Sequence, residues 1–589
     1  MSKTSLDKLK YNIQNLSWYL KRYNATKKSV NSFYDNHYDY WPVDDHIVVY
    51  DMQDGQELDD SPFAILRYWL SRHLDMQHII VAKFNTKEKI RRVLQFWQLD
   101  FNPNIVVVDY QSIEHMKALL TAKYIVTNAM IFSDVFVKRT GQVFVNTWHG
   151  TPLKKMGYAM PGGVMGSWNV IRTLMMTDYL VMPNEYTAEI FRRDYRLDGL
   201  YTGSILVTGY PRNDVLINHL PQYQSEFLYS MSLHHKKDRV IIYAPTWSGD
   251  TTQITTNREE LNNYLSVLKK IGSMQNIQIK FKPHPYFKAD VDADTRFDSY
   301  RLNDALGTNE ILSEADLLIT DYSSLFFDFL VTGKPIIFFD TKENYAQERG
   351  EYIGVRSLPG PYTKSTDELI KLLEKPKMWI YKYQEVYKQF KKNFTSSDDG
   401  HATQRVLELI TSKKVTSNLT VMTVLVNGED FSDTNFSETR LVTRLSKTYD
   451  VSIAAFESHL LDNWYGQIFF KHVDAVMPVS RIFINKYNVP YKNIAPQLAQ
   501  VMGKRVTGGK IFNVLIIIQK KFSRHQQIII SVAKTIIMTK NSKRVACLIK
   551  LGFSKSYENE RFQIWQKSPS QVQTEVQDIL KKIEDISIL

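Results

Sequence analysis

The stretch LLITDYSSLFFDFLVTGKPIIFF, at residues 317–339, contains the pattern that decides the fold class. Its first residues, Leu317–Thr320, form an apolar run that is typical of a buried strand. Ser323 and Ser324 then open a segment of helical length that stops near Gly333, and a second apolar run follows directly. A strand, a helix and a strand in this order predict a parallel sheet whose faces are covered by helices.

The same alternation of apolar runs and amphipathic segments extends upstream of this stretch. The earlier runs are HIVVYD (46–51), HIIVA (78–82), NIVVVD (104–109), YIVTN (124–128), VFVNT (143–147), DYLVM (178–182), ILVTGYPRND (205–214), RVIIYAPTW (239–247) and IQIKFKPHPY (277–286). A polar stretch at 218–238 separates two sets of runs. We therefore predict an α/β fold with two successive Rossmann-like domains, at 46–222 and 236–412. Ligands of such sheets bind beyond the carboxyl ends of the strands, here in a cleft between the domains.

The two ends of the chain differ from this central part. Residues 1–45 are aromatic and favour a helical segment that breaks at Trp41-Pro42. Residues 418–589 favour a further accessory α/β region, faintly similar to part of a glycosyltransferase. From Ala475 to Tyr557 this region contains lysines and arginines but no Asp or Glu. Such a stretch suits an anionic membrane surface, and an ordinary solvated basic face is the alternative.

Composition limits the classes of protein to which the chain can belong. Of the 589 residues, 43% are hydrophobic and 23% charged, as in ordinary globular proteins. The single cysteine, Cys547, excludes an internal disulfide framework, and we expect neither a secretory signal nor a membrane-spanning run. A net charge of +12 indicates an anionic partner: nucleic acid, an acidic membrane face or a phosphate-rich substrate. Aromatic RNA-binding motifs are not apparent, so we expect no nucleic-acid partner.

The stretch VNTWHGTPLKKMGY (145–158) places His149 where a predicted strand ends and a loop begins. An imidazole is the side chain best suited to accept a proton near neutral pH. A lone histidine at a strand end more often has a structural role, so both readings stay open on this motif alone. Lys154 and Lys155 follow as candidate phosphate or acceptor contacts.

Three further clusters carry groups that suit a phosphorylated ligand. In KFKPHPYF, Lys282 supplies a point charge and the prolines on either side hold His284 stiffly. Ser323 and Ser324 at a helix start suit an anion, and Asp328 one turn later suits a sugar hydroxyl. In the last cluster, Arg212 in GYPRND is a candidate for binding a phosphate through two hydrogen bonds. Pro245 and Thr246 in YAPTW form a candidate loop for packing against a nucleotide base. Turn and cap chemistry explains each cluster equally well when it is taken alone.

Together, TWHGTPLKKMGY, GYPRND, YAPTW, KPHP, TDYSSLFFDF and DDGHATQR resemble the CDP-glycerol glycerophosphotransferase family of bacterial wall teichoic acid synthesis. The resemblance covers about residues 46–410. It implies a GT-B fold, in which two Rossmann-like domains face each other across a cleft. It also implies transfer of glycerol phosphate from CDP-glycerol to a hydroxyl of a lipid-linked glycan or a growing poly(glycerol phosphate) chain. CMP is then released at the cytoplasmic face of the cell membrane, where the protein would be peripheral.

By motif position, the resemblance makes His149 the catalytic base. It implies substrate-binding roles for Trp148, Gly150, Thr151, Pro152, Arg212, Pro245, Thr246, Lys282, Pro283, His284, Ser323, Ser324 and Asp328. No Asp-x-Asp element lies beside these motifs, so we expect no metal and no cofactor, with CDP-glycerol as the donor substrate.

Two alternatives stay open at this stage. The donor can instead be CDP-ribitol, because the motif residues are mainly candidates for binding the nucleotide diphosphate and do not distinguish glycerol from ribitol. A catalytically inactive protein that binds polyanions through its basic surface is an alternative of another class. The sequence also leaves open the acceptor, the number of units added and whether the protein is a homo-oligomer.

Overall fold

The structure is a computed structural model that describes most of residues 41–412. Described with them are residues 33–34 and 37, and the gaps fall at 73–74, 132–135, 137, 140, 161–169, 171–172, 175, 196, 198–200, 202, 221–227, 230, 232–237, 247–257, 341–349 and 355–356. Beyond residue 412 it describes five strands. The expected N-terminal helical segment therefore lies mostly outside the described residues.

The first sheet has seven strands, all parallel, in the order β3-β2-β1-β4-β5-β6-β7. The strands are β1 (Asp44–Asp51), β2 (Gln77–Ala82), β3 (Ile105–Asp109), β4 (Ala122–Thr127), β5 (Val143–Asn146), β6 (Tyr179–Met182) and β7 (Ser204–Val207). Val48 and Val49 on adjacent positions of β1 are both fully buried, because helices cover both faces of the sheet. This confirms the predicted α/β class for the first part of the chain.

Helices and short 3₁₀ turns connect the strands of the first sheet. They are α3 (Asp60–Ser71), η1 (Phe84–Thr86), α4 (Lys87–Phe96), α5 (Ile113–Thr121), η2 (Gly157–Ala159), α7 (Glu185–Asp194), η4 (Pro211–Asn213) and α8 (Asp214–Asn218). Side chains cap several of them: Ser112 accepts from the N–H of His115 at the start of α5, and Asn184 accepts from that of Thr187 in α7. These caps satisfy N–H groups that a helix start leaves without a partner.

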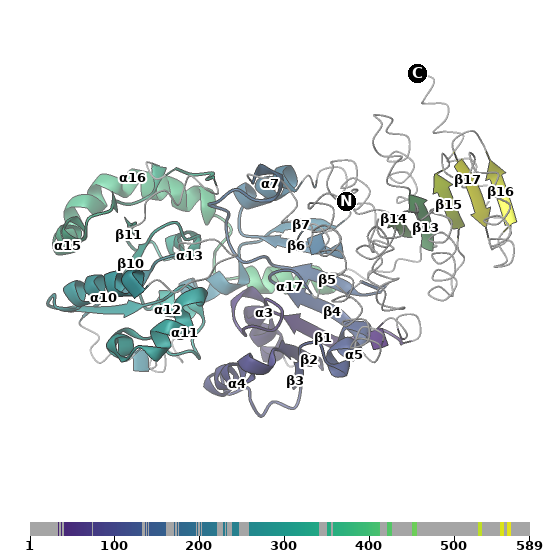
Figure 1. The fold of residues 1–589 in the computed structure, drawn as a ribbon, viewed down its shortest axis with the longest axis horizontal. Helices are drawn as coiled ribbons and strands as arrows, with labels where there is room; N and C mark the ends of the chain where they lie inside the picture. The colour runs from purple at the N-terminus through teal and green to yellow at the C-terminus, as the bar shows by residue number, and fades with distance from the viewer. Residues whose placement is uncertain are drawn as a thin grey trace, which may run out of the picture.

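The second sheet has five parallel strands in the order β12-β11-β10-β8-β9. They are β8 (Arg239–Ala244), β9 (Ile277–Phe281), β10 (Leu317–Thr320), β11 (Ile336–Phe339) and β12 (Tyr362–Thr363). The helical elements are α10 (Arg258–Gly272), α11 (Pro285–Ala293), η6 (Thr295–Tyr300), α12 (Thr308–Ser313), α13 (Leu325–Leu330), α15 (Thr366–Glu374) and α16 (Pro376–Phe394). Figure 1 shows the strands β10 and β11 with the helices α10 and α13 near them.

The stretch at 317–339 forms the predicted strand, helix and strand. β10 and β11 lie side by side in parallel, with Leu318 opposite Ile336. Helix α13 ends at Leu330, before the predicted stop. The N–H groups of Val331, Thr332 and Gly333 each donate to the carbonyl three residues back, which makes a tighter turn than an α-helix. This turn ends at Gly333, whose φ of +73° is left-handed.

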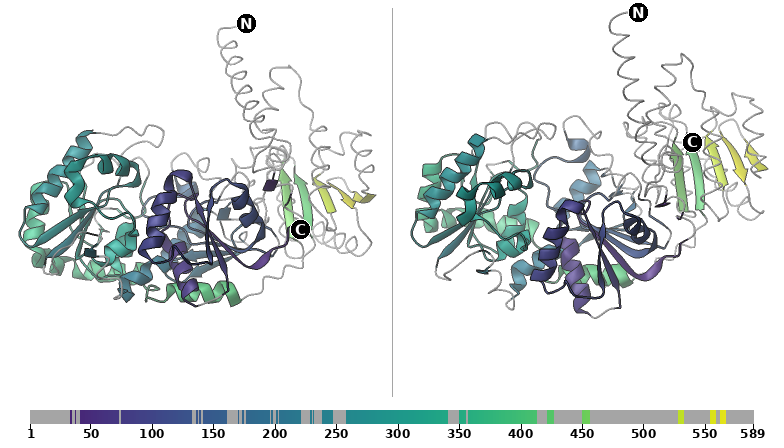
Figure 2. Two further views of the ribbon diagram at one scale, coloured as in Figure 1. Left: turned by 90° about the horizontal axis from the view of Figure 1, so that it is seen from below. Right: turned by 60° about the horizontal axis from the view of Figure 1, so that its bottom comes forward.

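The last helix of this part, α17 (Ala402–Ser412), returns to the first sheet and contacts α3 and η4. Figure 2 shows it in green beneath the helices of the first sheet. The carboxylate of Asp214 accepts from the N–H groups of Ala402 and Thr403 at 2.9 and 2.8 Å, and so caps α17. Asp398 accepts from the N–H of Tyr210 at 3.0 Å. These hydrogen bonds therefore join the GYPRND motif to the DDGHATQR motif.

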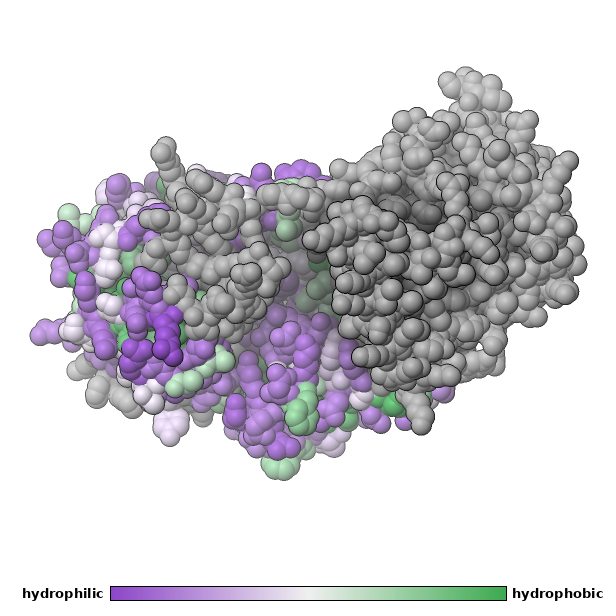
Figure 3. All heavy atoms as spheres, viewed as in Figure 1, coloured by the Kyte–Doolittle hydropathy of each residue, from purple (hydrophilic) through white to green (hydrophobic). Residues whose placement is uncertain are grey.

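A third sheet is described in the C-terminal region, in the order β14-β13-β15-β17-β16. Its strands are β13 (Val421–Val426), β14 (Asp450–Ala455), β15 (Ile528–Val532), β16 (Ser554–Glu558) and β17 (Phe562–Gln566). The rest of the predicted accessory region, including most of its acid-free stretch, lies outside the described residues. Across the described residues, no helix combines the length and apolar character needed to cross a bilayer. On the face seen in Figure 3, hydrophilic side chains cover most of the described surface.

Candidate active site

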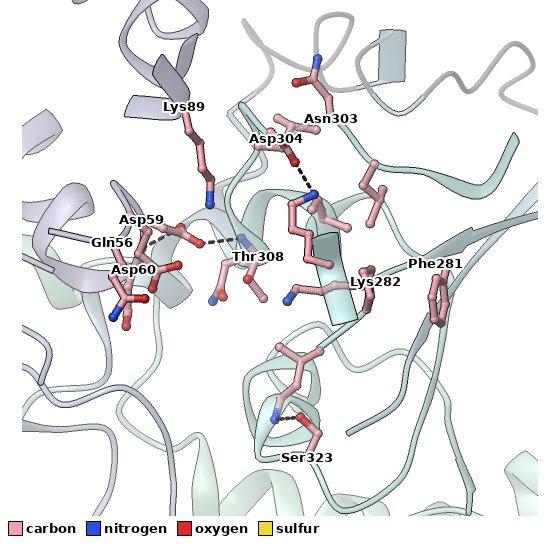
Figure 4. Close-up of a pocket in the computed structure, with 18 of the residues that line it drawn as sticks. Gln56, Asp59, Asp60, Lys89, Phe281, Lys282, Asn303, Asp304, Thr308 and Ser323 are labelled. Carbon is pink, nitrogen blue, oxygen red and sulfur yellow. Dashed lines mark hydrogen bonds and ion pairs between the residues drawn. The ribbon is translucent and has the colours of Figure 1, made fainter. Parts of the chain in front are cut away.

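A cavity of about 410 Å³ lies between the first and second sheets. One wall comes from the segment between β1 and α3, from α4 and from the loop after β5. The other wall comes from the end of β9, the turn before α12 and the start of α13 (Figure 4). The cavity therefore lies beyond the carboxyl ends of strands from both sheets, and its volume suits a small-molecule ligand.

His149 lines this cavity, three residues after the end of β5. Its Nδ1 lies 2.8 Å from the carbonyl oxygen of Asn128. A carbonyl can only accept, so Nδ1 carries the hydrogen and Nε2 keeps its lone pair. The ring stacks on Trp148 with 4.3 Å between the ring centroids, and the N–H of Trp148 donates to Asn146 at 2.8 Å. The loop thus fixes both the tautomer and the orientation of the imidazole.

The surroundings of His149 favour its neutral form. Burial among protein groups lowers its pKa, although the ring is open to the cavity. The hydrogen bond to Asn128 and the charge of Asp60 oppose this shift, and the charge of Arg212 adds to it. A neutral imidazole with a free Nε2 can accept a proton from a hydroxyl placed in the cavity.

Arg212 also lines the cavity, and two carboxylates hold its guanidinium. Its terminal nitrogens lie 2.9 Å from Asp60 Oδ1 and 3.0 Å from Asp328 Oδ2, and all three side chains are at least 90% buried. Burial raises the pKa of Asp328, and the charge of Arg212 opposes that shift. Arg212 and Asp328 thus bind each other across the two walls. Their expected roles toward a phosphate and a sugar hydroxyl stay predictions.

Five cationic side chains line the cavity: Lys89, Arg212, Lys282, Lys288 and Arg301. Besides Arg212, two of them are paired with carboxylates. Lys288 lies 2.6 Å from Asp304, and Arg301 lies 2.8 Å from Asp298. Both charges are therefore already balanced within the protein.

Lys282 and Lys89 are the two cavity cations without a carboxylate within 4 Å among the described residues. Burial lowers the pKa of Lys282, and the charges of Asp59 and Glu57 oppose that shift. The ammonium groups of both lysines point into the cavity in Figure 4. The expected role of Lys282 toward a phosphate stays a prediction.

The start of α13 meets the loop after His149. Ser323 Oγ accepts from the N–H of Leu325 at 3.3 Å, and Ser324 occupies the N-cap position without a side-chain bond to the helix. A Cβ added to Gly150 would lie 2.9 Å from Ser324 Oγ. Glycine at this position therefore lets the two walls approach each other.

Seven of the predicted site residues line the cavity: His149, Arg212, Lys282, Pro283, Ser323, Ser324 and Asp328. The other seven, Trp148, Gly150, Thr151, Pro152, Pro245, Thr246 and His284, do not. Several of these form its support. Trp148 packs in a buried apolar cluster with Phe191, and the N–H of Thr246 donates to the carboxylate of Asp321 at 2.8 Å. Their roles toward a substrate stay predictions.

The backbone of Lys154 and Lys155 joins the loop after β5 to the segment before β12. Lys154 forms an antiparallel bridge with Glu351, and the N–H of Lys155 donates to the carbonyl of Gly350 at 3.1 Å. Neither side chain lines the cavity.

The sequence reasoning missed an acidic part of the cavity wall. Glu57, Asp59 and Asp60 line it from the segment that leads into α3. Asp59 accepts from the N–H of Asp60 at 2.7 Å and from that of Thr308 at 3.1 Å, so one carboxylate bridges both walls. The run LDDSP carried a helix-start signal that could have marked this segment. Within the described part of the chain, no group of three or more His, Cys, Asp or Glu is arranged to hold a metal ion.

Residues 32–412, well over half of the chain, match the family described as CDP-glycerol:poly(glycerophosphate) glycerophosphotransferase. A teichoic acid poly(glycerol phosphate) polymerase of Bacillus spizizenii is 28% identical over 62% of this chain and 92% of its own length. A teichoic acid poly(ribitol-phosphate) polymerase of the same organism is 26% identical over 51% of this chain and 49% of its own. The chain spans about half the length of two further poly(glycerol phosphate) polymerases.

Among solved structures, a histidine-to-asparagine variant of the wall teichoic acid polymerase TagF, soaked with CDPG, is 27% identical with a TM-score of 0.54. The match covers 70% of this chain and 98% of that one. The chain belongs to the CDP-glycerol:poly(glycerophosphate) glycerophosphotransferase family.

Proposed function

We propose that this protein transfers glycerol phosphate from CDP-glycerol to a hydroxyl of a lipid-linked glycan or a growing poly(glycerol phosphate) chain, releasing CMP. The observation that carries the proposal is the setting of His149: a neutral imidazole, oriented by Asn128, in a cavity that also holds Lys282. Membership of the family and the named activity of the relatives support it.

The proposal includes a GT-B arrangement, in which the two sheets belong to domains that face each other across the cavity. Ties such as the pair between Arg212 and Asp328 support it, because they join the walls without filling the space between them. The donor then binds against the second sheet, beside Lys282 and Ser323. The acceptor approaches the first sheet, which carries His149.

The chemistry follows from the charges involved. An acceptor hydroxyl attacks the phosphorus that bears the glycerol, a new P–O bond forms, and the bond to the CMP oxygen breaks. His149 Nε2 takes the hydroxyl proton, because an alcohol is a poor nucleophile while it keeps that proton. Lys282 offsets the negative charge on the phosphoryl oxygens in the transition state. In this proposal the side chains of the protein supply these charges, and no cofactor is needed.

A ribitol donor is the second candidate, and the match to a poly(ribitol-phosphate) polymerase favours keeping it. That relative covers less of this chain than the glycerol-phosphate polymerase does. Glycerol is therefore the donor polyol that we propose.

We further propose that the protein works as a peripheral protein on the cytoplasmic face of the membrane, where a lipid-linked acceptor is presented. The net charge of +12 supports attraction to an anionic surface. Assembly into a homo-oligomer is a further proposal, which sedimentation of the purified chain tests.

Release of CMP by the purified protein tests the main proposal. CDP-glycerol and CDP-ribitol are each supplied with a lipid-linked acceptor, in buffer with and without EDTA. We expect CMP from CDP-glycerol, a slower release from CDP-ribitol and no effect of EDTA. Absence of CMP with both donors contradicts the proposal and leaves the polyanion-binding alternative.

A further inference from the structure

Helix α4 carries four cationic side chains, and one of them differs from the rest. Lys87 lies 2.7 Å from Asp109, Arg91 lies 3.5 Å from Glu88, and Arg92 lies 3.6 Å from Asp304. Lys89 has no carboxylate within 4 Å among the described residues, and it lines the cavity. Figure 4 shows its side chain reaching from α4 into the space between the walls.

Lys89 belongs to the wall that carries His149, whereas Lys282 belongs to the opposite wall. Among the residues that the structure describes, each sheet thus contributes one cavity cation that has no carboxylate within 4 Å. A transfer to poly(glycerol phosphate) brings two kinds of anion together: the diphosphate of the donor and the phosphodiester next to the acceptor hydroxyl. The base must contact the acceptor, so the cation on its wall is placed for the acceptor anion.

Glu57 lies on the same wall as Lys89. Burial raises the pKa of Glu57 to about 7, with the charge of Asp59 adding to the shift and that of Lys89 opposing it. No hydrogen bond or ion pair engages its carboxyl group among the described residues. A carboxylate beside a phosphate site repels a second phosphate but accepts from a hydroxyl.

We propose that Lys89 and Glu57 form a subsite for the terminal glycerol phosphate of the acceptor, in which Lys89 binds the phosphodiester and Glu57 accepts from a glycerol hydroxyl. This inference rests on the proposed function and adds a preference to it. The protein favours acceptors that already end in glycerol phosphate, and so extends a chain rather than starting one. Lys282 remains with the donor.

Steady-state release of CMP from CDP-glycerol tests the preference with two acceptors. One is a short-chain lipid ending in a single glycerol phosphate, and the other is the same lipid ending in an unphosphorylated glycerol. A charged hydrogen bond contributes roughly 1.5–3 kcal/mol, so the wild-type KM should be about 10-fold or more lower for the phosphorylated acceptor. Lys89→Ala should remove this difference and leave the KM for CDP-glycerol within about 2-fold.

Three further variants separate this role from a structural one. Arg91→Ala removes a neighbouring cation that lies outside the cavity, and it should retain the preference. Glu57→Gln keeps an acceptor oxygen and should raise the KM for both acceptors less than Glu57→Ala does. Both Glu57 variants should leave the KM for CDP-glycerol unchanged.

Calorimetry without the donor gives a readout that does not depend on turnover. The probe is glycerophosphoglycerol, which should bind the wild-type chain and the Arg91→Ala variant but bind Lys89→Ala about 10-fold more weakly. Equal binding by Lys89→Ala, or a rise in the KM for CDP-glycerol instead of the acceptor, would overturn the inference. If the wild-type chain binds the probe through Lys89 but releases no CMP, the proposed function fails and the subsite stands.

Discussion

Replacing Arg212 with leucine removes the cation that joins the two walls of the cavity while keeping an apolar side chain in its place. In the variant, Asp60 and Asp328, whose side chains are 10% and 5% exposed, lose the guanidinium that lay 2.9 and 3.0 Å from them. Removing one partner of a buried ion pair costs roughly 3–5 kcal/mol, because the other charge stays buried without compensation. We therefore expect a loss of at least about 3 kcal/mol in the free energy of unfolding at pH 8.

The loss should depend on pH in a defined direction. Burial already raises the pKa of Asp328 with Arg212 present, and removal of Arg212 raises it further. A carboxyl group with a raised folded-state pKa favours the folded state while it is protonated, and this benefit is lost as the pH rises through that pKa. The variant should therefore be less destabilised at pH 5.5 than at pH 8.

Urea-induced unfolding at the two pH values measures both effects. For a urea dependence of about 3 kcal/mol per molar, the midpoint should fall by about 1 M at pH 8 and by less at pH 5.5. Arg296→Leu is the control, because Arg296 pairs with Asp294 on the surface, and its midpoint should stay near the wild-type value. A fall no larger than that of the control, or one that is equal at both pH values, would refute the reasoning.

Three further substitutions test other parts of the site. His149→Ala should lower kcat by about 10²- to 10⁴-fold, while calorimetry shows unchanged binding of CDP-glycerol. Because burial lowers the pKa of His149, the wild-type rate should fall only at pH values below the usual titration range of histidine. Unchanged turnover in the variant would contradict the proposed role of His149 as base. Gly150→Ala should lower both CMP release and the melting temperature, since its Cβ would lie 2.9 Å from Ser324 Oγ, and failure of a second change, Ser324→Ala, to restore them would count against this contact. Asp214→Ala should cost about 1–2 kcal/mol in urea unfolding, because the two N–H groups at the start of α17 lose their acceptor, whereas Asp214→Asn should cost less.

Local patterns explain why the strands and the position of His149 at the cavity were predictable. A short apolar run such as Leu317–Thr320 is typical of a strand that is buried on both faces, and the alternation of such runs with amphipathic segments indicated the α/β class. Lys282 could be found because it directly follows such a strand, and His149 because it lies three residues after one; strand ends of parallel sheets meet where ligands bind.

The sequence by itself therefore determined the fold class and the two sets of strands. Seven of the fourteen site residues that it predicted line the cavity. Only the tertiary structure decided that Arg212 pairs with both Asp60 and Asp328, and that Asp59 accepts from the N–H of Thr308. The members of these groups lie more than a hundred residues apart in several cases, and no local pattern encodes which carboxylate meets which cation. For the same reason, only the structure could distinguish Lys89 from the other cations of α4, because it alone among them has no carboxylate within 4 Å in the described part of the chain.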